Sequence, residues 1–215
     1  MVAATIAPVL RADAARNRAR VLAAAERLLA EHGVDVSMQE IADAAGVGVG
    51  TVFRRFPTKD DLVVAVLLAR MEDIATLAER AVEQSVDDPW TAFADFFIGA
   101  TELHTRHRGL MESIGSTHSV CSSLAEVRGR LVRDLRTLVA RAVDAGELRP
   151  DVVAEDIPVI QCAISRTSSM PIAAAEPEAW RRSCALLLDG MRASSARSPL
   201  APVLPTFEQV LCAQR

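Results

Sequence analysis

Apolar residues recur every three or four positions along almost the whole chain, which is the period of an amphipathic α-helix. The first such run places Val21, Leu22, Ala25 and Leu29 on one face of a helix that Asp13 can cap. Runs of β-branched residues are short, whereas the strong helix formers Ala, Leu and Arg dominate. The pattern predicts an all-α fold of about nine helices.

Proline and glycine punctuate this pattern and set the expected helix ends. The longer predicted helices cover residues 59–85, 89–107, 124–145, 153–169 and 178–193, and a short one follows near residues 110–114. Residues 115–123 are small and polar and read as a loop.

The stretch of residues 37–59 carries the densest local signals. Ser37 and Glu40 have the spacing of a capping box, in which a hydroxyl and a carboxylate each satisfy a backbone N–H at a helix start. Gly46 permits a left-handed turn a few residues later. Two short helices joined by such a turn form a helix-turn-helix, whose second helix enters the major groove of DNA.

The run EIADAAGVGVGTVFRRFPTKDDL resembles the DNA-binding signature of the TetR family of transcriptional regulators. The matching elements, in register, are Ile41-Ala42, Ala45-Gly46-Val47, Gly50-Thr51, Phe53, Phe56, Pro57-Thr58, and Lys59 followed by an acidic pair and Leu62. The resemblance covers residues 14–65 closely, and GELRPDVVAEDI and PEAWRRSCALLLDGMR resemble regulatory domains of some members. The chain departs from the family where Gly48-Val49 replaces Ser-Lys, Phe53 replaces Tyr, and Arg55 replaces Tyr or His.

The resemblance implies a DNA-contacting surface. It places Gln39, Gly48, Val49, Gly50 and Thr51 near bases, Ser37, Phe53, Arg55 and Lys59 near phosphates, and Arg54 within reach of either. Arg54 can read guanine through a bidentate contact, Gln39 can pair with adenine, and Val49 and Thr51 can touch a thymine methyl. The two glycines supply no base-reading group. Phe53 leaves two interpretations open, because its ring can rest on the sugar-phosphate backbone or pack inward.

The net charge changes this picture little. The 215 residues carry a net charge of −4, but residues 1–60 hold eight basic and seven acidic side chains, a net +1, and the remainder carries −5. This distribution permits DNA binding without indicating it. No apolar run approaches the roughly 18 residues that span a bilayer, and the basic residues of the N-terminus follow the apolar ones. We expect a cytoplasmic protein without membrane contact.

Candidate chemistry is sparse. Cys121, Cys162, Cys184 and Cys212 are irregularly spaced, and no Cys/His spacing fits zinc, so we predict no metal and no cofactor. Buried free thiols are one interpretation of these cysteines, and a redox sensor is the other. The chain has no Gly-x-Ser-x-Gly motif, no glycine-rich phosphate loop and no carboxylate pair on one face. We predict no catalytic residues and no enzyme.

The expected organisation has four parts. They are a flexible arm over residues 1–12, a helix-turn-helix domain over 13–60, a helical regulatory and dimerisation domain over 61–194, and a Pro-containing tail over 195–215. The helix over residues 59–85 starts in the DNA-binding part and ends in the regulatory part, so we expect it to carry a signal between them.

A regulator of this class needs a switch, and the second part offers a candidate small-molecule cavity. Its predicted lining is mostly apolar with a few polar groups, the usual recipe for such a site: Phe96, Phe97, His104, Met111, His118, Gln161 and Ser165. The aromatic residues and the histidine of this predicted lining each have a second, purely structural interpretation. Phe96 and Phe97 lie on an apolar stripe and can be ordinary core, and His104 can be a satisfied histidine at the core or rim.

The function we expect is that of a homodimeric repressor, released from a pseudo-palindromic double-stranded DNA operator by a small-molecule effector of unknown identity. The helices over residues 153–169 and 178–193 are apolar on more than one side and are the predicted dimer faces, through Ile157, Ile160, Ile164, Trp180, Leu187 and Met191. The alternative is a DNA-binding regulator controlled by a protein partner, or an activator, without a small-molecule pocket.

Overall fold

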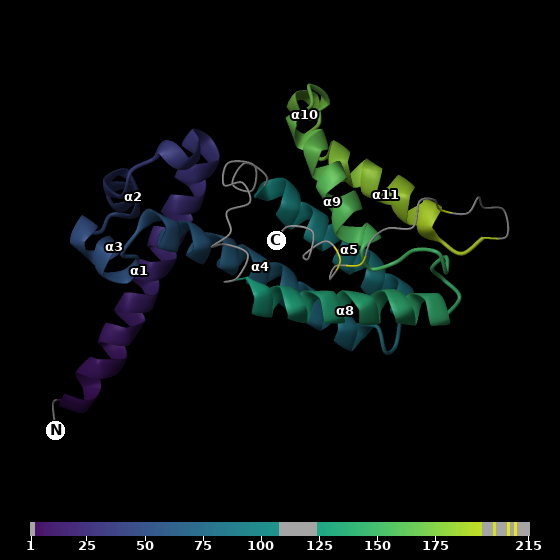
Figure 1. Cartoon of the computed structure of the whole chain (residues 1–215), viewed down its shortest axis with the longest axis horizontal. Coiled ribbons are helices and arrows are strands. Elements are labelled where there is room, and N and C mark those ends of the chain that lie inside the picture. The colour runs from purple at the N-terminus through teal and green to yellow at the C-terminus, as the bar shows by residue number, and fades with distance from the viewer. Residues whose placement is uncertain (1–2, 108–123, 195–199, 201–205, 207–208, 210–215) are drawn as a thin grey trace. The chain divides into compact units, whose positions relative to one another are not determined.

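The structure is a computed structural model that describes residues 3–107 and 124–194, together with residues 200, 206 and 209 (Figure 1). Its described residues form nine α-helices and no strand. The helices are α1 (Ala3–His32), α2 (Met38–Ala45), α3 (Val49–Arg55), α4 (Lys59–Gln84), α5 (Pro89–Arg106), α8 (Ala125–Asp144), α9 (Asp156–Ser165), α10 (Ile172–Ala175) and α11 (Ala179–Met191). The predicted all-α fold is confirmed.

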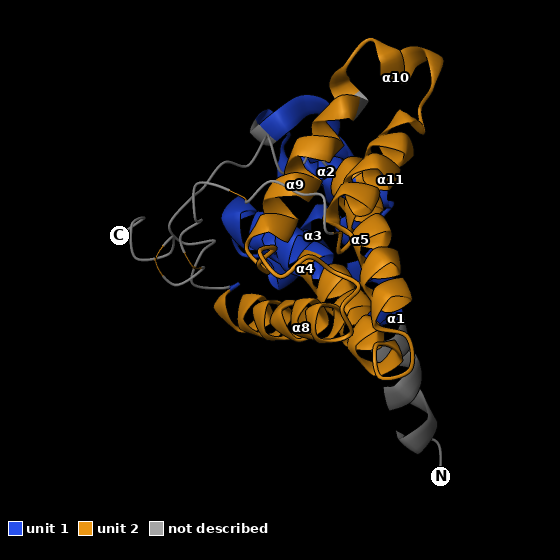
Figure 2. Ribbon diagram, turned by 90° about the vertical axis from the view of Figure 1, so that its right-hand side faces the viewer, with its two compact units in different colours: residues 1–70, 107–124 blue, residues 71–106, 125–215 orange. Residues whose placement is uncertain are grey.

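The chain divides into two compact units (Figure 2). Unit 1 contains residues 1–70 and 107–124, and unit 2 contains residues 71–106 and 125–215. Helix α4 therefore belongs to both: its first twelve residues, up to Arg70, lie in unit 1, and the rest lies in unit 2.

Unit 1 is built on α1, which packs on α2, and α2 packs on α3. The sides of these helices that face one another are fully apolar. Ala25 and Leu29 of α1, Ile41 and Ala42 of α2, and Val52 of α3 are all buried. Leu62 and Val66, in the first turns of α4, complete this small core.

Helix α1 begins at Ala3, so the predicted helix start at Asp13 is wrong, and residues 3–12 of the expected arm are helical. The helix passes through Pro8, and most of residues 3–12 are the strong helix formers Ala, Leu and Arg. The presence of Pro8 therefore does not prevent residues 3–12 from forming a helix.

Unit 2 surrounds α5, which contacts α8, α9 and α11. Asp88 caps α5 by accepting a hydrogen bond from the Thr91 N–H at 3.0 Å, and this bond lowers the pKa of the Asp88 carboxyl. Phe93, Phe96 and Phe97 of α5 are fully buried among the apolar sides of the surrounding helices. Three rings on one helix give this unit its largest buried apolar surface.

The predicted helices of unit 2 match the observed ones within a few residues, except near residue 153. Helix α9 begins at Asp156, three residues later than predicted, with Pro158 in its first turn. The first turn is the part of a helix that tolerates proline. A 3-10 turn over Arg166–Ser169 ends this segment, and the short helix α10 was not predicted.

Several predictions fall on residues that the structure does not describe. These are the short helix near residues 110–114, the loop over 115–123 and most of the tail over 195–215. Across the part of the chain that is described, no helix is both long and apolar enough to cross a membrane.

Candidate functional site

Helix α2 starts at the predicted capping box. The Ser37 Oγ accepts a hydrogen bond from the Glu40 N–H at 3.2 Å, and the Ser37 N–H donates to Glu40 Oε2 at 2.7 Å. The Ser37 hydroxyl also donates to Glu40 Oε2 at 2.7 Å, and the two bonds that this carboxylate accepts, first that from the Ser37 N–H and then that from the hydroxyl, lower its pKa. Two backbone groups that helix formation leaves without partners are satisfied, which fixes where α2 begins.

The turn between α2 and α3 depends on Gly46. Its φ of +62° lies in the left-handed region that favours glycine, and its N–H donates to the Asp43 carbonyl at 3.0 Å. Arg20 of α1 lies against the same residue and donates from Nη2 to the Gly46 carbonyl at 3.3 Å. A Cβ at Gly46 would come within 2.5 Å of that nitrogen. The turn is therefore closed by α1 as well as by its own backbone.

Helix α3 is anchored on one side and open on the other. Val52 is 1% exposed and packs into the unit 1 core. Every residue predicted to contact DNA lies at the surface: Ser37, Gln39, Gly48, Gly50, Phe53, Arg54 and Arg55 are exposed, and Val49, Thr51 and Lys59 are half-buried. The structure thus gathers the predicted residues on the accessible parts of α2, α3 and the start of α4, where contact with DNA stays a prediction.

The exposure of the Phe53 side chain distinguishes between its two interpretations, packing inward or facing a sugar-phosphate backbone. Its side chain is 47% exposed on α3, so the inward-packing interpretation is wrong. A large aromatic ring held at the surface beside Arg54 and Arg55 is available to rest against a sugar-phosphate backbone.

Gln39 has a partner that the sequence did not lead us to expect. Its Nε2 donates to Asp43 Oδ1 at 2.8 Å, four residues further along α2. The i,i+4 spacing of an amide and a carboxylate on one helix is the signal that could have revealed this contact. Since the amide nitrogen carries two N–H groups, this bond leaves one donor and the Oε1 acceptor of Gln39 for pairing with adenine.

The start of α4 repeats the capping arrangement of α2. The Thr58 N–H donates to Asp61 Oδ2 at 2.9 Å, and the Asp61 N–H donates to Thr58 Oγ1 at 3.1 Å. Pro57 precedes this cap and cannot continue α3. As a result, Lys59 is the first residue of a helix that leads directly from the exposed surface of α3 into unit 2.

Comparison with known proteins identifies the family. The family model of bacterial regulatory proteins, tetR family, matches residues 21–66, and that of the SbtR-like transcriptional regulator C-terminal domain matches residues 88–193. The crystal structure of a TetR transcription regulatory protein from Mycobacterium vanbaalenii is 33% identical, covers 85% of this chain and 99% of its own, and superposes with a TM-score of 0.63. The chain belongs to the TetR family of transcriptional regulators.

Two further relatives show how the likeness is distributed along this TetR-family chain. An HTH-type transcriptional regulator of Staphylococcus aureus is 42% identical over 59 residues, which are 27% of this chain but only 32% of that protein. FadR of Bacillus subtilis, in complex with stearoyl-CoA, has a TM-score of 0.63 and covers 83% of this chain and 98% of its own. At 19% identity this second likeness shows the fold alone.

The residues predicted to line an effector cavity differ in burial, and two of them are not described by the structure. Phe96 and Phe97 are buried in the unit 2 core, and Gln161 of α9 donates from Nε2 to the Phe97 carbonyl at 3.2 Å. Ser165 is also buried and donates to the Cys162 carbonyl at 2.8 Å. His104 is half-buried on α5. Met111 and His118 lie outside the described residues. The structure thus brings Phe97 and Gln161 together, and the lining itself stays a prediction.

A pocket that the sequence did not indicate lies between α5 and α11. It has a volume of about 340 Å³ and is lined by Trp90, Ala94, Ile98, Arg181, Ala185, Leu188, Asp189 and Arg192. The Arg192 guanidinium lies over the Trp90 ring at 3.9 Å from its centre. No single stretch of sequence carries this pocket, because its walls come from two helices that are about 90 residues apart in the chain.

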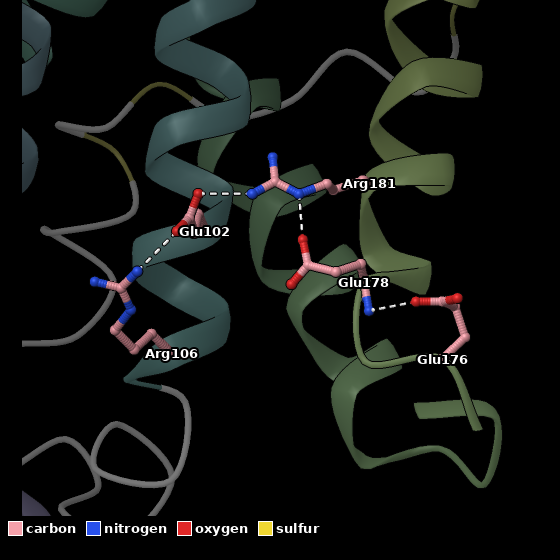
Figure 3. Close-up of polar contacts among 5 residues, drawn as sticks. All are labelled: Glu102, Arg106, Glu176, Glu178 and Arg181. Atoms are coloured by element: carbon pink, nitrogen blue, oxygen red, sulfur yellow. Dashed lines mark hydrogen bonds and ion pairs between the residues drawn. The ribbon is translucent and has the colours of Figure 1, made fainter. Parts of the chain in front are cut away.

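Ion pairs tie α5 to α11 beside this pocket (Figure 3). Arg181 of α11 donates to Glu102 of α5 at 3.0 Å and also pairs with Glu178. Glu102 accepts a second hydrogen bond, at 2.7 Å, from Arg106 one turn along α5. Since all these side chains are largely exposed, we expect a modest contribution of each pair to stability.

The predicted dimer-face residues need correction. Ile157, Ile164, Trp180 and Met191 are buried in the core of unit 2, so their assignment to a partner surface is wrong. The outer faces of α9 and α11 carry a different apolar set. Its exposed members are Val159 and Ala163 on α9 and Ala185, Leu186 and Leu187 on α11.

Proposed function

We propose that this TetR-family regulator is a homodimeric repressor that binds a pseudo-palindromic operator and leaves it when a small molecule binds unit 2. The observation that carries the DNA-binding part is the exposure of Phe53, Arg54 and Arg55 on α3, a helix that is anchored in the core through the buried Val52. In a helix-turn-helix this is the helix that enters the major groove.

Each group on this surface has a proposed task. Arg54 reads a guanine through two hydrogen bonds, and Arg55 and Lys59 neutralise phosphates. Gly48 and Gly50 contribute no side chains at the start of α3, so specificity rests on few groups. Gln39, Thr51 and Arg54 are those groups.

The dimer face is proposed to be the outer surface of α9 and α11. Val159 is 59% exposed and Leu186 is 63% exposed, and a surface of large aliphatic side chains of this kind marks an association site. A twofold axis through it presents the same residues from both copies and gives two recognition helices for two operator half-sites.

Leu186→Arg tests the dimer. Analytical ultracentrifugation of the wild type should give a dimer at micromolar concentration, and the variant should give a monomer that still unfolds cooperatively, because Leu186 lies outside the core. Val86→Arg is the matched control, since Val86 is equally exposed outside α9 and α11. A dimer that persists in Leu186→Arg would place the interface elsewhere.

The effector is proposed to act through α4, which is shared by the two units. A ligand that binds one arrangement of unit 2 more tightly shifts the population toward it, and α4 carries the change to Lys59 and α3. A structural neighbour, the Bacillus subtilis FadR, was crystallised with stearoyl-CoA, which supports a small-molecule effector as a class without identifying it.

Selection from a random-sequence duplex library tests the function as a whole. The purified protein should enrich a pseudo-palindrome and bind it with an affinity that falls steeply with salt. Failure to enrich any sequence would contradict the proposal. Enrichment of an operator from which no small molecule of the host cell's extract releases the protein would favour the alternative of control by a protein partner.

A further inference from the structure

The first half of α1 is positively charged and precedes the part of the helix that enters the core of unit 1. Residues 3–20 hold four arginines and one aspartate, a net charge of +3, whereas residues 21–60 hold four basic and six acidic side chains, a net −2. The side chains of residues 13–20 are exposed or half-buried, and burial begins at Val21. Figure 1 shows α1 extending past α2 and α3 toward its N-terminus. The net positive charge of residues 1–60 therefore comes from a segment outside the helix-turn-helix.

Helical spacing places one of these arginines, Arg18, on the side of α1 that faces the core. Arg18 precedes Leu22, Ala25 and Leu29 by 4, 7 and 11 residues, so the four residues share one face of the helix. The three apolar residues are buried, and Arg18 is half-buried. An arginine at the edge of a core can pack its aliphatic stem against apolar surface while its guanidinium stays in water.

The contact of Arg20 shows which part of the helix-turn-helix lies beside this end of α1. Arg20 Nη2 donates to the Gly46 carbonyl at 3.3 Å, in the turn that leads into α3. Arg18 is only two residues, or about 3 Å along the helix axis, before Arg20. The first residues of a recognition helix face the base edges, and the phosphate backbones border the groove that they enter. Arg18 thus lies at the level of the turn that precedes the DNA-reading end of α3.

The guanidinium of Arg18 is also available for a partner. Within the part of the chain that the structure describes, it makes neither a hydrogen bond nor an ion pair. The neighbouring arginines are engaged: Arg16 pairs with Asp13, and Arg20 donates to Gly46. A guanidinium has the fixed, planar set of donors that binds a phosphate through two hydrogen bonds.

We propose that Arg18 is a further DNA contact, outside the helix-turn-helix, whose guanidinium binds a backbone phosphate beside the major groove that α3 enters. This contact contributes affinity and fixes the position of unit 1 on the duplex, and it reads no base. The inference rests on the DNA binding proposed above and adds to it a contact from α1.

Arg18→Met tests this contact, since methionine keeps an unbranched apolar stem for packing and carries no charge. The affinity of the full-length protein for its selected operator duplex is measured at several salt concentrations. Loss of one phosphate contact in each of two protomers should reduce the slope of the logarithm of the association constant against the logarithm of salt by about two. Over a fourfold rise in salt, the wild type should therefore lose roughly tenfold more affinity than the variant. The preference for the operator over unrelated DNA should stay the same, because a phosphate contact acts on all sequences.

Arg16→Met is the matched control. Arg16 is an arginine of the same helix, two residues away, but that spacing turns it to the opposite side of α1, where it pairs with Asp13. Its slope should stay close to that of the wild type. Thermal unfolding followed by circular dichroism shows whether both variants fold, and Arg18→Gln is the second neutral variant if Arg18→Met does not.

Neutral methylphosphonate linkages, placed one at a time in the operator, locate the phosphate. One linkage in each half-site should weaken binding of the wild type and have no further effect on Arg18→Met, as expected for two groups that interact directly. Wild-type affinity and slope in Arg18→Met, or equal losses in Arg16→Met and Arg18→Met, would overturn the inference and leave the proposed function intact. Absence of salt-dependent binding of the wild type to any duplex would instead contradict the proposed function.

Discussion

Two phenylalanines, one from each unit of this protein, differ sharply in their exposure to solvent. In unit 2, Phe97 lies on α5 with no exposed surface, whereas in unit 1 Phe53 lies on α3 with nearly half of its surface in solvent. The first ring contributes to holding a fold together, and the second is kept available for a partner. The comparison shows that the same residue type is packed into the core at one position and held at the surface at the other, where we propose that it contacts DNA.

Replacing each ring by alanine gives the largest contrast. Phe97→Ala should lower the free energy of unfolding by about 3–5 kcal/mol, because it leaves a cavity among packed side chains. Phe53→Ala should change it by less than about 0.5 kcal/mol, as is usual at the surface, and should weaken operator binding instead. Urea unfolding measures both. Equal losses of stability in Phe97→Ala and Phe53→Ala would contradict the different roles given to the two rings.

Alanine substitutions at two glycines of unit 1, Gly46 and Gly50, should change the stability in opposite directions and by smaller amounts. Gly46→Ala should lower stability by about 1–2 kcal/mol, because alanine is strained at positive φ. The added Cβ also meets Arg20 Nη2, but this is the flexible end of a long side chain and can move away. Gly50→Ala should raise stability by about 0.5–1 kcal/mol, since that position is helical and nothing lies within 4 Å of the added Cβ.

Thermal unfolding followed by circular dichroism distinguishes the two glycine variants. Arg20→Ala in the Gly46→Ala background should recover little of the loss, because the flexible Arg20 guanidinium can move away from the added Cβ. A Gly46→Ala protein as stable as the wild type would mean that the turn does not need its left-handed conformation.

The smallest expected effect concerns pH and the cap of α2. The hydrogen bonds from Ser37 lower the pKa of Glu40 below its ordinary value of 4.5, so the folded protein keeps this carboxylate charged at a pH where the unfolded chain protonates it. The stabilisation is therefore present above about pH 4.5 and is lost as the pH falls below that value. Glu40→Gln should melt below the wild type at pH 7, with a difference that shrinks toward pH 3. A difference that does not vary with pH would contradict this account of the cap.

The two units also differ in how far their sequence predicts them. In unit 1, short-range signals identify individual residues: the cap at Ser37 and the left-handed Gly46 were both predicted and are both observed. Such signals work because both partners lie within four residues, so the chain alone brings them together.

In unit 2, periodicity predicts the helices but not what each face meets. Ile157 and Val159 are neighbouring aliphatic residues of α9, yet the first is buried and the second is 59% exposed. A helix that is apolar on several sides has no pattern that distinguishes its own core from a partner surface. The α5–α11 pocket was missed for a related reason, because it depends on residues that tertiary packing brings together.

The central claim is that the exposed side of α3 binds the DNA backbone and bases, and the salt dependence of operator binding tests it most directly. The logarithm of the association constant is plotted against the logarithm of the salt concentration for the wild type, for Arg55→Ala and for Arg80→Ala, an exposed arginine of α4 in unit 2. Loss of one phosphate contact in each of two protomers should weaken binding and reduce the slope for Arg55→Ala by about two, with Arg80→Ala unchanged. An Arg55→Ala protein with the wild-type affinity and slope would contradict the claim.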